Sequence, residues 1–354
     1  MFYTMDLSKN ELIIFGVAGA VLVAAGVFAA VTLFSGPATS SVEEGGANAV
    51  PEQSTFAMYV DVNGLVTADS SRDVGEFAYE DQSKTYSQVI NEPIDNDEGS
   101  LNISATDIDY ITGFGKSSSV NNTSPTDFED AFFTETYTGV VVAFEQPLDK
   151  KFENTSDVFD NDTEVTETEY NGHTVYELNS SADGQTRQYY IGVLDRNTIV
   201  VGKQNVVEDS IDTLEGDNPS VSGDVKDALQ TKETVYVKFA ANLSEYENSD
   251  TTARTEYVND IQLVTGKYET EGSQMNVSVS LELTSESSAT QAESNLNSYI
   301  GALQFFITQD NEAAQQELSK MTVERDGTSV TLEYNTSSTS IIEALEGQET
   351  GQRT

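Results

Sequence analysis

Residues Asp107–Gly113 read DIDYITG, and residues Asp260–Gly266 read DIQLVTG, so one heptapeptide pattern occurs twice in the chain. A second pair of related segments follows, Tyr170–Val175 (YNGHTV) and Arg325–Val330 (RDGTSV). The glycine that ends the heptapeptide precedes the glycine of the second segment by 59 residues in the first copy and by 61 in the other. Matches in the same order at nearly constant spacing indicate an internal duplication.

Between these landmarks each copy carries a strand with alternating apolar residues, Tyr137–Phe144 (YTGVVVAF) and Met275–Leu283 (MNVSVSLEL). Alternation with a period of two is typical of a β-strand with one face toward a core. We therefore predict two related tandem domains, residues 52–225 and residues 230–347, that form the body of the protein.

Two short turns define a hairpin in each copy. Asn171-Gly172 and Asp326-Gly327 are residue pairs that tolerate positive φ at both central turn positions, and such pairs join antiparallel strands. The cross-strand pairs expected from these turns are Thr168–Val175 and Val323–Val330. A further hairpin, Tyr189–Leu194 and Thr198–Gly202, is present in the first copy alone.

Helices are predicted after the strands of each copy. One apolar stripe at helical spacing is expected to face the sheet, namely Ala289, Ala292, Leu296, Tyr299, Ile300 and Leu303. Both copies close on similar helices, which are expected to stop at Gly216 and Gly347. The fold class predicted is α+β: an N-terminal transmembrane helix, then two tandem domains, each a mostly antiparallel sheet with helices packed on one face.

The segment Leu12–Phe34 (LIIFGVAGAVLVAAGVFAAVTLF) contains no charge and no proline. As a helix it would extend about 35 Å, enough to cross a membrane. The apolar run is longer than that of a cleaved signal peptide, which favours an uncleaved signal anchor. Residues 12–34 are therefore predicted to bind the lipid bilayer.

The positive charges predict the orientation of this anchor. Lys9 precedes the apolar run, and the next basic residue is Arg72. Because positive residues favour the cytoplasmic side, residues 1–11 are expected inside the cell and the body outside, in a single-pass cell-membrane protein. Residues 35–55 are predicted to be a flexible linker, and residues 348–354 a disordered tail.

Small residues recur every four positions in the apolar segment. Gly16, Ala20 and Ala24 would let two anchors pack closely and self-associate. The alternative is that Gly and Ala are simply common in such helices.

The chain is very acidic, with 60 Asp and Glu against 17 Lys and Arg and a net charge of -43. Such charge opposes a compact state by self-repulsion, but in molar salt the screening length falls to about 3 Å. The composition is therefore typical of proteins from extreme halophiles such as haloarchaea. Intrinsic disorder is the competing interpretation of high charge, and the 16 Phe, the 16 Tyr and the patterned strands oppose it. Nucleic acid is excluded as a partner, because no basic face is present.

Few residues are suited to catalysis or cofactor binding. The chain has no cysteine and a single histidine, His173, placed directly after a hairpin turn, where exposure or an incidental hydrogen bond is expected. No cofactor-binding or catalytic motif is found, so none is assigned. Carboxylates at calcium-like spacing occur at Asp95, Asp97, Asp160, Asp162 and Glu164. A solvated acidic loop is the alternative at both places.

Nine N-x-S/T sequons follow the anchor and are candidates for glycosylation. They begin at Asn102, Asn121, Asn122, Asn154, Asn161, Asn179, Asn242, Asn276 and Asn335.

The run from Pro51, PEQSTFAMYVDVNGL, resembles the start of the ectodomain in uncharacterised, N-terminally anchored surface proteins of haloarchaea or their viruses. The resemblance covers the anchor, the spacer and the first strand, and it implies no activity. The sequence thus predicts a non-enzymatic surface protein with a structural or binding role toward another surface protein or polymer. The alternatives are an extracellular hydrolase that uses carboxylates, or a pilin-like or viral envelope subunit.

Overall fold

The computed structural model describes residues 44–79, 85–91, 95–96, 99–100, 104–116, 137–147, 163–182, 185–230, 235–244, 260–307 and 312–351. The strands are β1 (Phe56–Asp61), β4 (Ile108–Gly115), β5 (Thr138–Phe144), β6 (Thr163–Tyr170), β7 (His173–Ala182), β8 (Gln185–Val193), β9 (Thr198–Gly202), β10 (Val235–Asn242), β11 (Ile261–Glu271), β12 (Gln274–Leu283), β13 (Met321–Asp326) and β14 (Ser329–Ser337), with the short pair β2 (Asp95–Asn96) and β3 (Gly99–Ser100). The helices are η1 (Glu44–Ala49), α2 (Val62–Thr67), α3 (Asp69–Tyr79), α4 (Tyr86–Asn91), η2 (Ala105–Asp107), α6 (Gln204–Glu215), α7 (Gly223–Leu229), α8 (Glu286–Ile307), α9 (Glu312–Leu318) and α10 (Ser338–Gly351).

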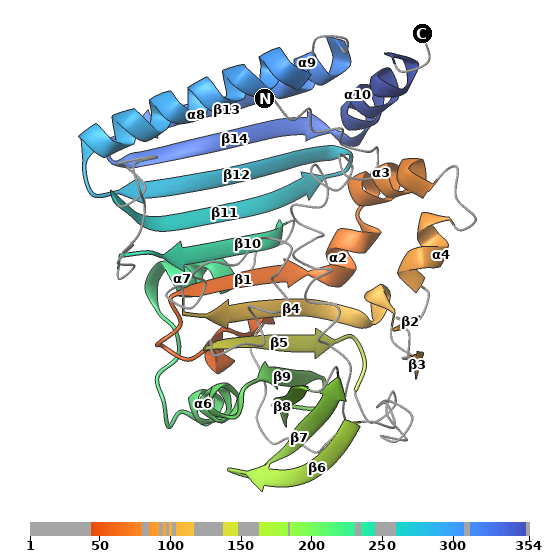
Figure 1. The fold of residues 1–354 in the computed structure, drawn as a ribbon, viewed down its shortest axis with the longest axis vertical. Coiled ribbons are helices and arrows are strands. Elements are labelled where there is room, and N and C mark those ends of the chain that lie inside the picture. Colours follow the sequence, from red (N-terminus) through yellow and green to blue (C-terminus); the bar gives the residue numbers. More distant parts are fainter. Residues whose placement is uncertain are drawn as a thin grey trace.

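Twelve strands form one antiparallel sheet, which Figure 1 shows stacked along the long axis of the molecule. The strand order is β13-β14-β12-β11-β10-β1-β4-β5-β9-β8-β7-β6. The two copies meet in the middle, where β1 pairs antiparallel with β10 and Met58 lies opposite Phe239. The prediction of two separate domains, each with its own sheet, is therefore wrong. Pairing β1 with β10 satisfies two strand edges that separate domains would leave open.

The two halves of this sheet share a strand order. The second copy runs β10-β11-β12-β14-β13 outward from the centre, and the first runs β1-β4-β5-β9-β8-β7-β6. The orders coincide once the hairpin β8–β9, which the first copy alone contains, is removed from between β5 and β7. The strand order is therefore consistent with an internal duplication, although the copies are joined by backbone hydrogen bonds.

Helices cover both faces of the sheet, and the prediction that they pack on one face is also wrong. On one face, Val62 and Leu65 of α2 and Ile341 of α10 join a core with alternate residues of the strands. On the other face, Val207 and Ile211 of α6 belong to a second core. The cause is visible in β5, whose seven residues are all buried, since a strand apolar on both sides requires cover on both sides.

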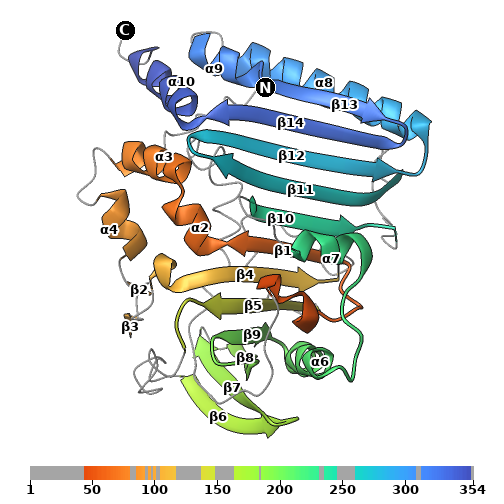
Figure 2. The ribbon, with the colours of Figure 1, turned by 180° about the vertical axis from the view of Figure 1, so that it is seen from behind.

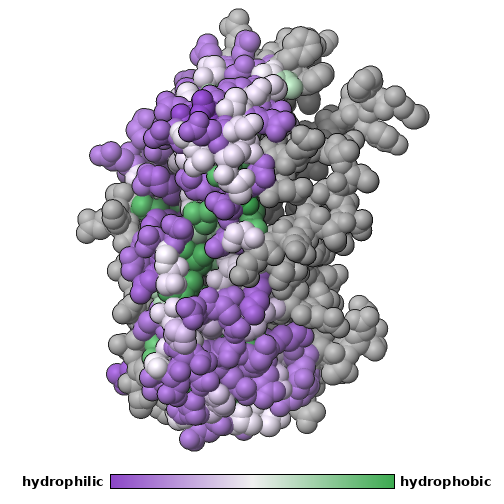
Figure 3. All heavy atoms as spheres, turned by 90° about the vertical axis from the view of Figure 1, so that its left-hand side faces the viewer, coloured by the Kyte–Doolittle hydropathy of each residue, from purple (hydrophilic) through white to green (hydrophobic). Residues whose placement is uncertain are grey.

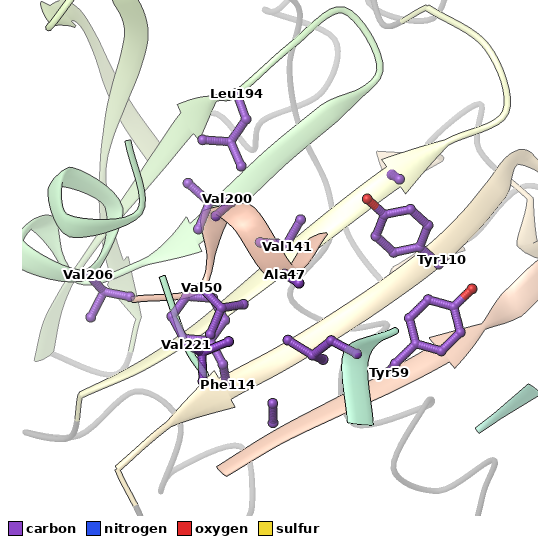
Figure 4. Packing of buried hydrophobic residues seen from close by; sticks show 14 of the residues in the cluster. Ala47, Val50, Tyr59, Tyr110, Phe114, Val141, Leu194, Val200, Val206 and Val221 are labelled. Carbon is purple, nitrogen blue, oxygen red and sulfur yellow. The ribbon is translucent and has the colours of Figure 1, made fainter. Parts of the chain in front are cut away.

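The second core lies between α6, α7, η1 and the sheet. Figure 4 shows Val141, Phe114 and Val200 of the sheet packed beside Val50 and Val206 from the covering segments. On the opposite face α8 forms a smaller cluster, in which Ala289 and Ala292 pack against Leu283 and Val330.

The helix α8 confirms most of the predicted apolar stripe. Ala289, Ala292 and Ile300 are buried, whereas Tyr299 is 64% exposed. Tyr299 was a wrong member of the stripe, because adjacent helical residues project about 100° apart and Ile300 faces the sheet.

The two closing helices differ in place and in length. The helix α6 ends at Gly216, which has φ of 86° and is left-handed, as predicted. The helix α10 instead continues through Gly347 to Gly351 and packs on the opposite face of the sheet from α6.

No helix among the described residues is long and apolar enough to cross a membrane. The predicted anchor at residues 12–34, its small residues Gly16, Ala20 and Ala24, and the preceding residues 1–11 lie outside the described part of the chain. Seen from the side, hydrophilic residues dominate the upper and lower parts of the molecule, and apolar residues reach the surface in a narrow band between them (Figure 3).

Candidate functional site: an open polar face on strands β10 to β14

Most of the predicted calcium ligands cannot be placed. Asp95 lies on the short strand β2 and Glu164 on the edge strand β6, whereas Asp97, Asp160 and Asp162 lie outside the described residues. No group of three or more acidic or histidine side chains suited to a metal is found among the residues that the structure describes.

Four of the nine sequons fall on described strands. Asn242 and Asn335 are exposed, and Asn179 is half-buried on β7, where its Nδ2 donates a hydrogen bond to Glu177. Asn276 lies directly opposite Asn335, and its Oδ1 is buried with no hydrogen-bond partner within the described structure. The five sequons at other positions lie outside the described residues: Asn102, Asn121, Asn122, Asn154 and Asn161.

The single histidine links two elements of the fold. His173 is fully buried, with Nδ1 2.8 Å from the carbonyl oxygen of Val193 and Nε2 2.9 Å from Oε1 of Glu215. These contacts join the hairpin β7–β8 to the last residue of α6. Exposure, one of the two outcomes expected from the sequence, is thus wrong, and the hydrogen bonds hold two elements together.

One buried carboxylate is found among the described residues, that of Glu317 on α9. The hydroxyls of Tyr334 and Thr336 donate to its Oε2 at 2.8 and 2.6 Å, and Lys320 donates to Oε1. Burial and the neighbouring carboxylate raise the pKa of Tyr334. This cluster fixes α9 on β14, and it contains no second buried carboxylate for paired acid–base chemistry.

The open face of the sheet lies on the second copy, on the side where α7 packs. The helix α7 covers β10 and β1, whereas no described helix crosses β11, β12 or β14 on this side (Figure 2). The side chains presented there are polar except that of Leu263, which packs against the second core. The polar side chains are Lys238, Thr265, Lys267, Glu269, Asn276, Ser278, Ser280, Glu282, Ser329, Thr331, Glu333 and Asn335.

The strand alternation explains this polarity. In β12, the residues of the opposite face are Met275, Val277, Val279, Leu281 and Leu283, which contribute to the two apolar clusters or lie beside them. Between them stand Asn276, Ser278, Ser280 and Glu282 on the open side. Across from β12, the hydroxyl of Ser280 lies 3.2 Å from that of Ser329 and 3.1 Å from that of Thr331, so a row of hydroxyls crosses to β14.

A groove of about 240 Å³ forms where α7 ends over this open face. Asp224 and Asp227 of α7 line one side, and Lys238, Thr265 and Lys267 line the floor. Phe239, Gly266, Ser278 and Ser280 complete the lining. The groove therefore has ammonium groups, carboxylates and hydroxyls among its lining residues, and carbon atoms form most of its exposed surface.

The two lysines of the groove are directly opposite each other on β10 and β11. The ammonium of Lys238 donates to the backbone oxygens of Asp227 and Gln230, at 3.0 and 2.7 Å, and so binds the C-terminal end of α7. The ammonium of Lys267 donates to Oε2 of Glu269 at 2.9 Å, and its side chain is 43% exposed. Both lysines are half-buried, and each ammonium already has a hydrogen-bond acceptor.

Part of this site could be found from the sequence. The alternating pattern of Met275–Leu283 indicates a strand with one polar side. The pairing of Lys238 with Lys267, 29 residues apart, depends on the register of β10 against β11, which no turn signal in the sequence defines.

Comparison with known proteins gives little further information. No family model matches the chain, and no curated protein matches it. Among solved structures, crystal form I of TP0453 matches with a TM-score of 0.40 and 11% identity, over 87% of this chain and 98% of that chain. Crystal form IV of TP0453 gives a TM-score of 0.42 and 11% identity, over 85% and 96% of the two chains. A likeness at these TM-scores carries no argument about the fold or the function of this chain.

Proposed function

We propose that this chain is a non-enzymatic surface protein of a halophile that binds a surface polymer or protein through the open polar face of β10 to β14. The observation that carries the proposal is the groove on a sheet face that no described helix covers. Polar side chains on a sheet face that no described helix covers can contact a partner.

The sequence supports a location at the cell surface. The apolar segment of residues 12–34 would hold the protein at the membrane, with Lys9 on the cytoplasmic side and the body outside. Net charge of -43 suits a body that faces concentrated salt, where self-repulsion is screened.

The binding role is tested by capture of envelope components in molar salt, with the full chain as bait and Ser278→Tyr as the variant. Ser278 lines the groove, and a tyrosine there would fill it. Ser294→Tyr is the matched control, because Ser294 is exposed on α8, which packs on the opposite face of the sheet. We expect Ser278→Tyr to reduce capture about tenfold and Ser294→Tyr to leave it unchanged. Equal capture by all three proteins would refute the proposal.

The location is tested separately. A protease added to intact cells should digest the residues that follow the apolar segment. In a second experiment, a variant that lacks residues 12–34 should no longer float with membranes. A body protected from protease in intact cells would contradict the external location.

A further inference from the structure

The four sequons on described strands differ in how accessible they are. A sequon serves as a glycan acceptor where it lies at the surface, because the transferring enzyme must reach the asparagine amide and the hydroxyl two residues later. Three of the four begin inside the sheet, at Asn179 of β7, Asn276 of β12 and Asn335 of β14. The fourth begins at Asn242, the last residue of β10. The structure thus separates acceptors that the sequence treats as equal.

The sequons inside the sheet are obstructed. Asn179 has β6 and β8 on its two sides, Asn276 has β11 and β14, and both residues are half-buried. Asn335 is exposed, but the hydroxyl of its sequon belongs to Ser337, which is half-buried at the start of α10. That hydroxyl donates to the hydroxyl of Ser340 at 3.0 Å and accepts from the backbone N–H of Ser340 at 3.2 Å. An enzyme that engaged it would have to open the first turn of the helix.

The sequon at Asn242 has neither obstacle. Asn242 and Ser244 are both exposed, which is true of no other sequon on the described strands. The backbone N–H and the hydroxyl of Ser244 donate to Oδ1 of Asn242, at 3.0 and 2.6 Å. The amide and the hydroxyl that define a sequon therefore lie side by side on the surface. The N–H of Leu243 between them donates to the carbonyl oxygen of Gln262, so the backbone there stays joined to the sheet.

The surroundings of Asn242 also favour a hydrophilic cover. Figure 1 shows β10 ending on the side of the molecule that Figure 3 presents, where apolar residues reach the surface. Leu263 lies directly opposite Asn242 on β11, and both Leu263 and Leu243 are only half-buried. A glycan is bulky and solubilising, so one attached at Asn242 would shield these side chains from contact with other molecules.

A glycan at this position is compatible with binding at the open face. Side chains alternate along a strand, so Asn242 lies on the same side of β10 as Lys238, which lines the groove. The two residues are four positions apart, which is about 13 Å along a strand. The glycan would stand at the border of the open face and leave the groove accessible.

From these observations, and resting on the external location in the proposed function, we infer that Asn242 is a site of N-glycosylation. The donor is a lipid-linked oligosaccharide activated by phosphate, and the catalyst is a membrane oligosaccharyl transferase of the cell. A bond forms between Nδ2 of Asn242 and the anomeric carbon of the glycan. The bond from that carbon to the phosphate oxygen of the lipid breaks, and one amide proton is released.

The test is mass spectrometry of the full chain, produced in a haloarchaeal host and isolated from its membranes in molar salt. We expect the peptide that contains Asn242 to carry a glycan. Asn242→Gln and Ser244→Ala should both remove it, because the first lacks the acceptor amide and the second lacks the hydroxyl. Ser244→Thr should keep the glycan, because threonine supplies the same hydroxyl. Asn276→Gln is the matched control and should leave the mass of the attached glycans unchanged.

The outcomes separate this inference from the proposed function. A glycoprotein of the host, analysed in the same sample, shows that the transferase is active. An unmodified Asn242 in a body that added protease digests on intact cells would overturn the inference and leave the external location standing. A modification that persists in Ser244→Ala would also overturn it, because the transfer would then not use the sequon. A body protected from protease would refute the location, and with it the glycosylation.

Discussion

At the scale of single residues, carboxylates in the described part of the chain accept hydrogen bonds mostly from neutral groups. Along α6, Asp209 accepts from Tyr137 and Gln53, and Asp212 accepts from Tyr170 and Asn171. A chain with 60 acidic and 17 basic residues has too few cations to pair with them. Tyrosine, amide and hydroxyl groups donate hydrogen bonds to the carboxylates where lysine or arginine is lacking. A hydrogen bond from a neutral donor to a carboxylate needs no positive charge.

Removing the buried histidine should destabilise the fold. In His173→Ala, the contacts of the buried ring with the carbonyl oxygen of Val193 and with the carboxylate of Glu215 are lost, and the loss of a buried hydrogen bond costs about 1–3 kcal/mol. Urea unfolding in molar salt measures the change. Arg196→Ala, at the exposed tip of the turn between β8 and β9, serves as control and should stay within about 0.5 kcal/mol of the parent protein. Equal stability of the two variants would contradict the structural role of His173.

The tyrosines predict an alkaline limit to stability. Burial raises the pKa of Tyr86 from 10.0 to about 12. Below about pH 10 both folded and unfolded chains hold this proton, whereas between pH 10 and 12 the unfolded chain loses it first, so stability falls as pH rises. Unfolding free energies measured from pH 9 to 12 should therefore decline above pH 10. The decline should be less steep in Tyr86→Phe, and an identical slope would show that Tyr86 does not titrate in this way.

At the scale of elements, turn chemistry determines which residues face each other. Asn171 and Gly172 both have positive φ, and Thr168 pairs with Val175 as predicted. In the second copy Gly327 alone has positive φ, the turn is Gly327-Thr328, and Val323 pairs with Leu332. The predicted pair Val323–Val330 was wrong, because glycine at the first central position shifts the turn by one residue.

Close packing of α6 on the sheet depends on glycine. A Cβ added at Gly192 of β8 would lie 2.7 Å from Cγ1 of Val207 and 3.2 Å from Cδ1 of Ile211. Gly192→Ala should therefore displace α6 and cost about 1–3 kcal/mol. Gly301→Ala is the opposite case, since nothing lies within 4 Å of its added Cβ on the exposed side of α8, and it should stabilise by roughly 0.5–1 kcal/mol. Thermal unfolding compares the two, and a neutral Gly192→Ala would contradict the packing described.

At the scale of the whole molecule, the pairing of β1 with β10 makes the two copies one cooperative unit. A fragment of residues 230–351 would expose the edge of β10 and the apolar side chains near Val237. We expect this fragment to be unfolded or aggregated alone, and a second fragment of residues 44–230 to restore structure on mixing. Size-exclusion chromatography and circular dichroism in molar salt measure this. A monomeric fragment with its own cooperative unfolding would contradict the single-sheet architecture.

The charge of the whole chain predicts a dependence on salt. With a net charge of -43, repulsion is screened over about 3 Å in molar salt and over about 30 Å at 0.01 M. Dialysis to low salt should therefore unfold the protein, as followed by circular dichroism. A fold indifferent to salt would refute the halophilic interpretation.

Local sequence determined the strands, the first hairpin turn and the stop of α6 at Gly216, because alternation, turn residues and glycine act over a few neighbouring positions. Only the tertiary structure decided that β1 pairs with β10, that helices cover both faces and that Lys238 meets Lys267. Those features depend on which edges find partners among residues far apart in the chain, and a strand's own sequence describes its sides but not its neighbour.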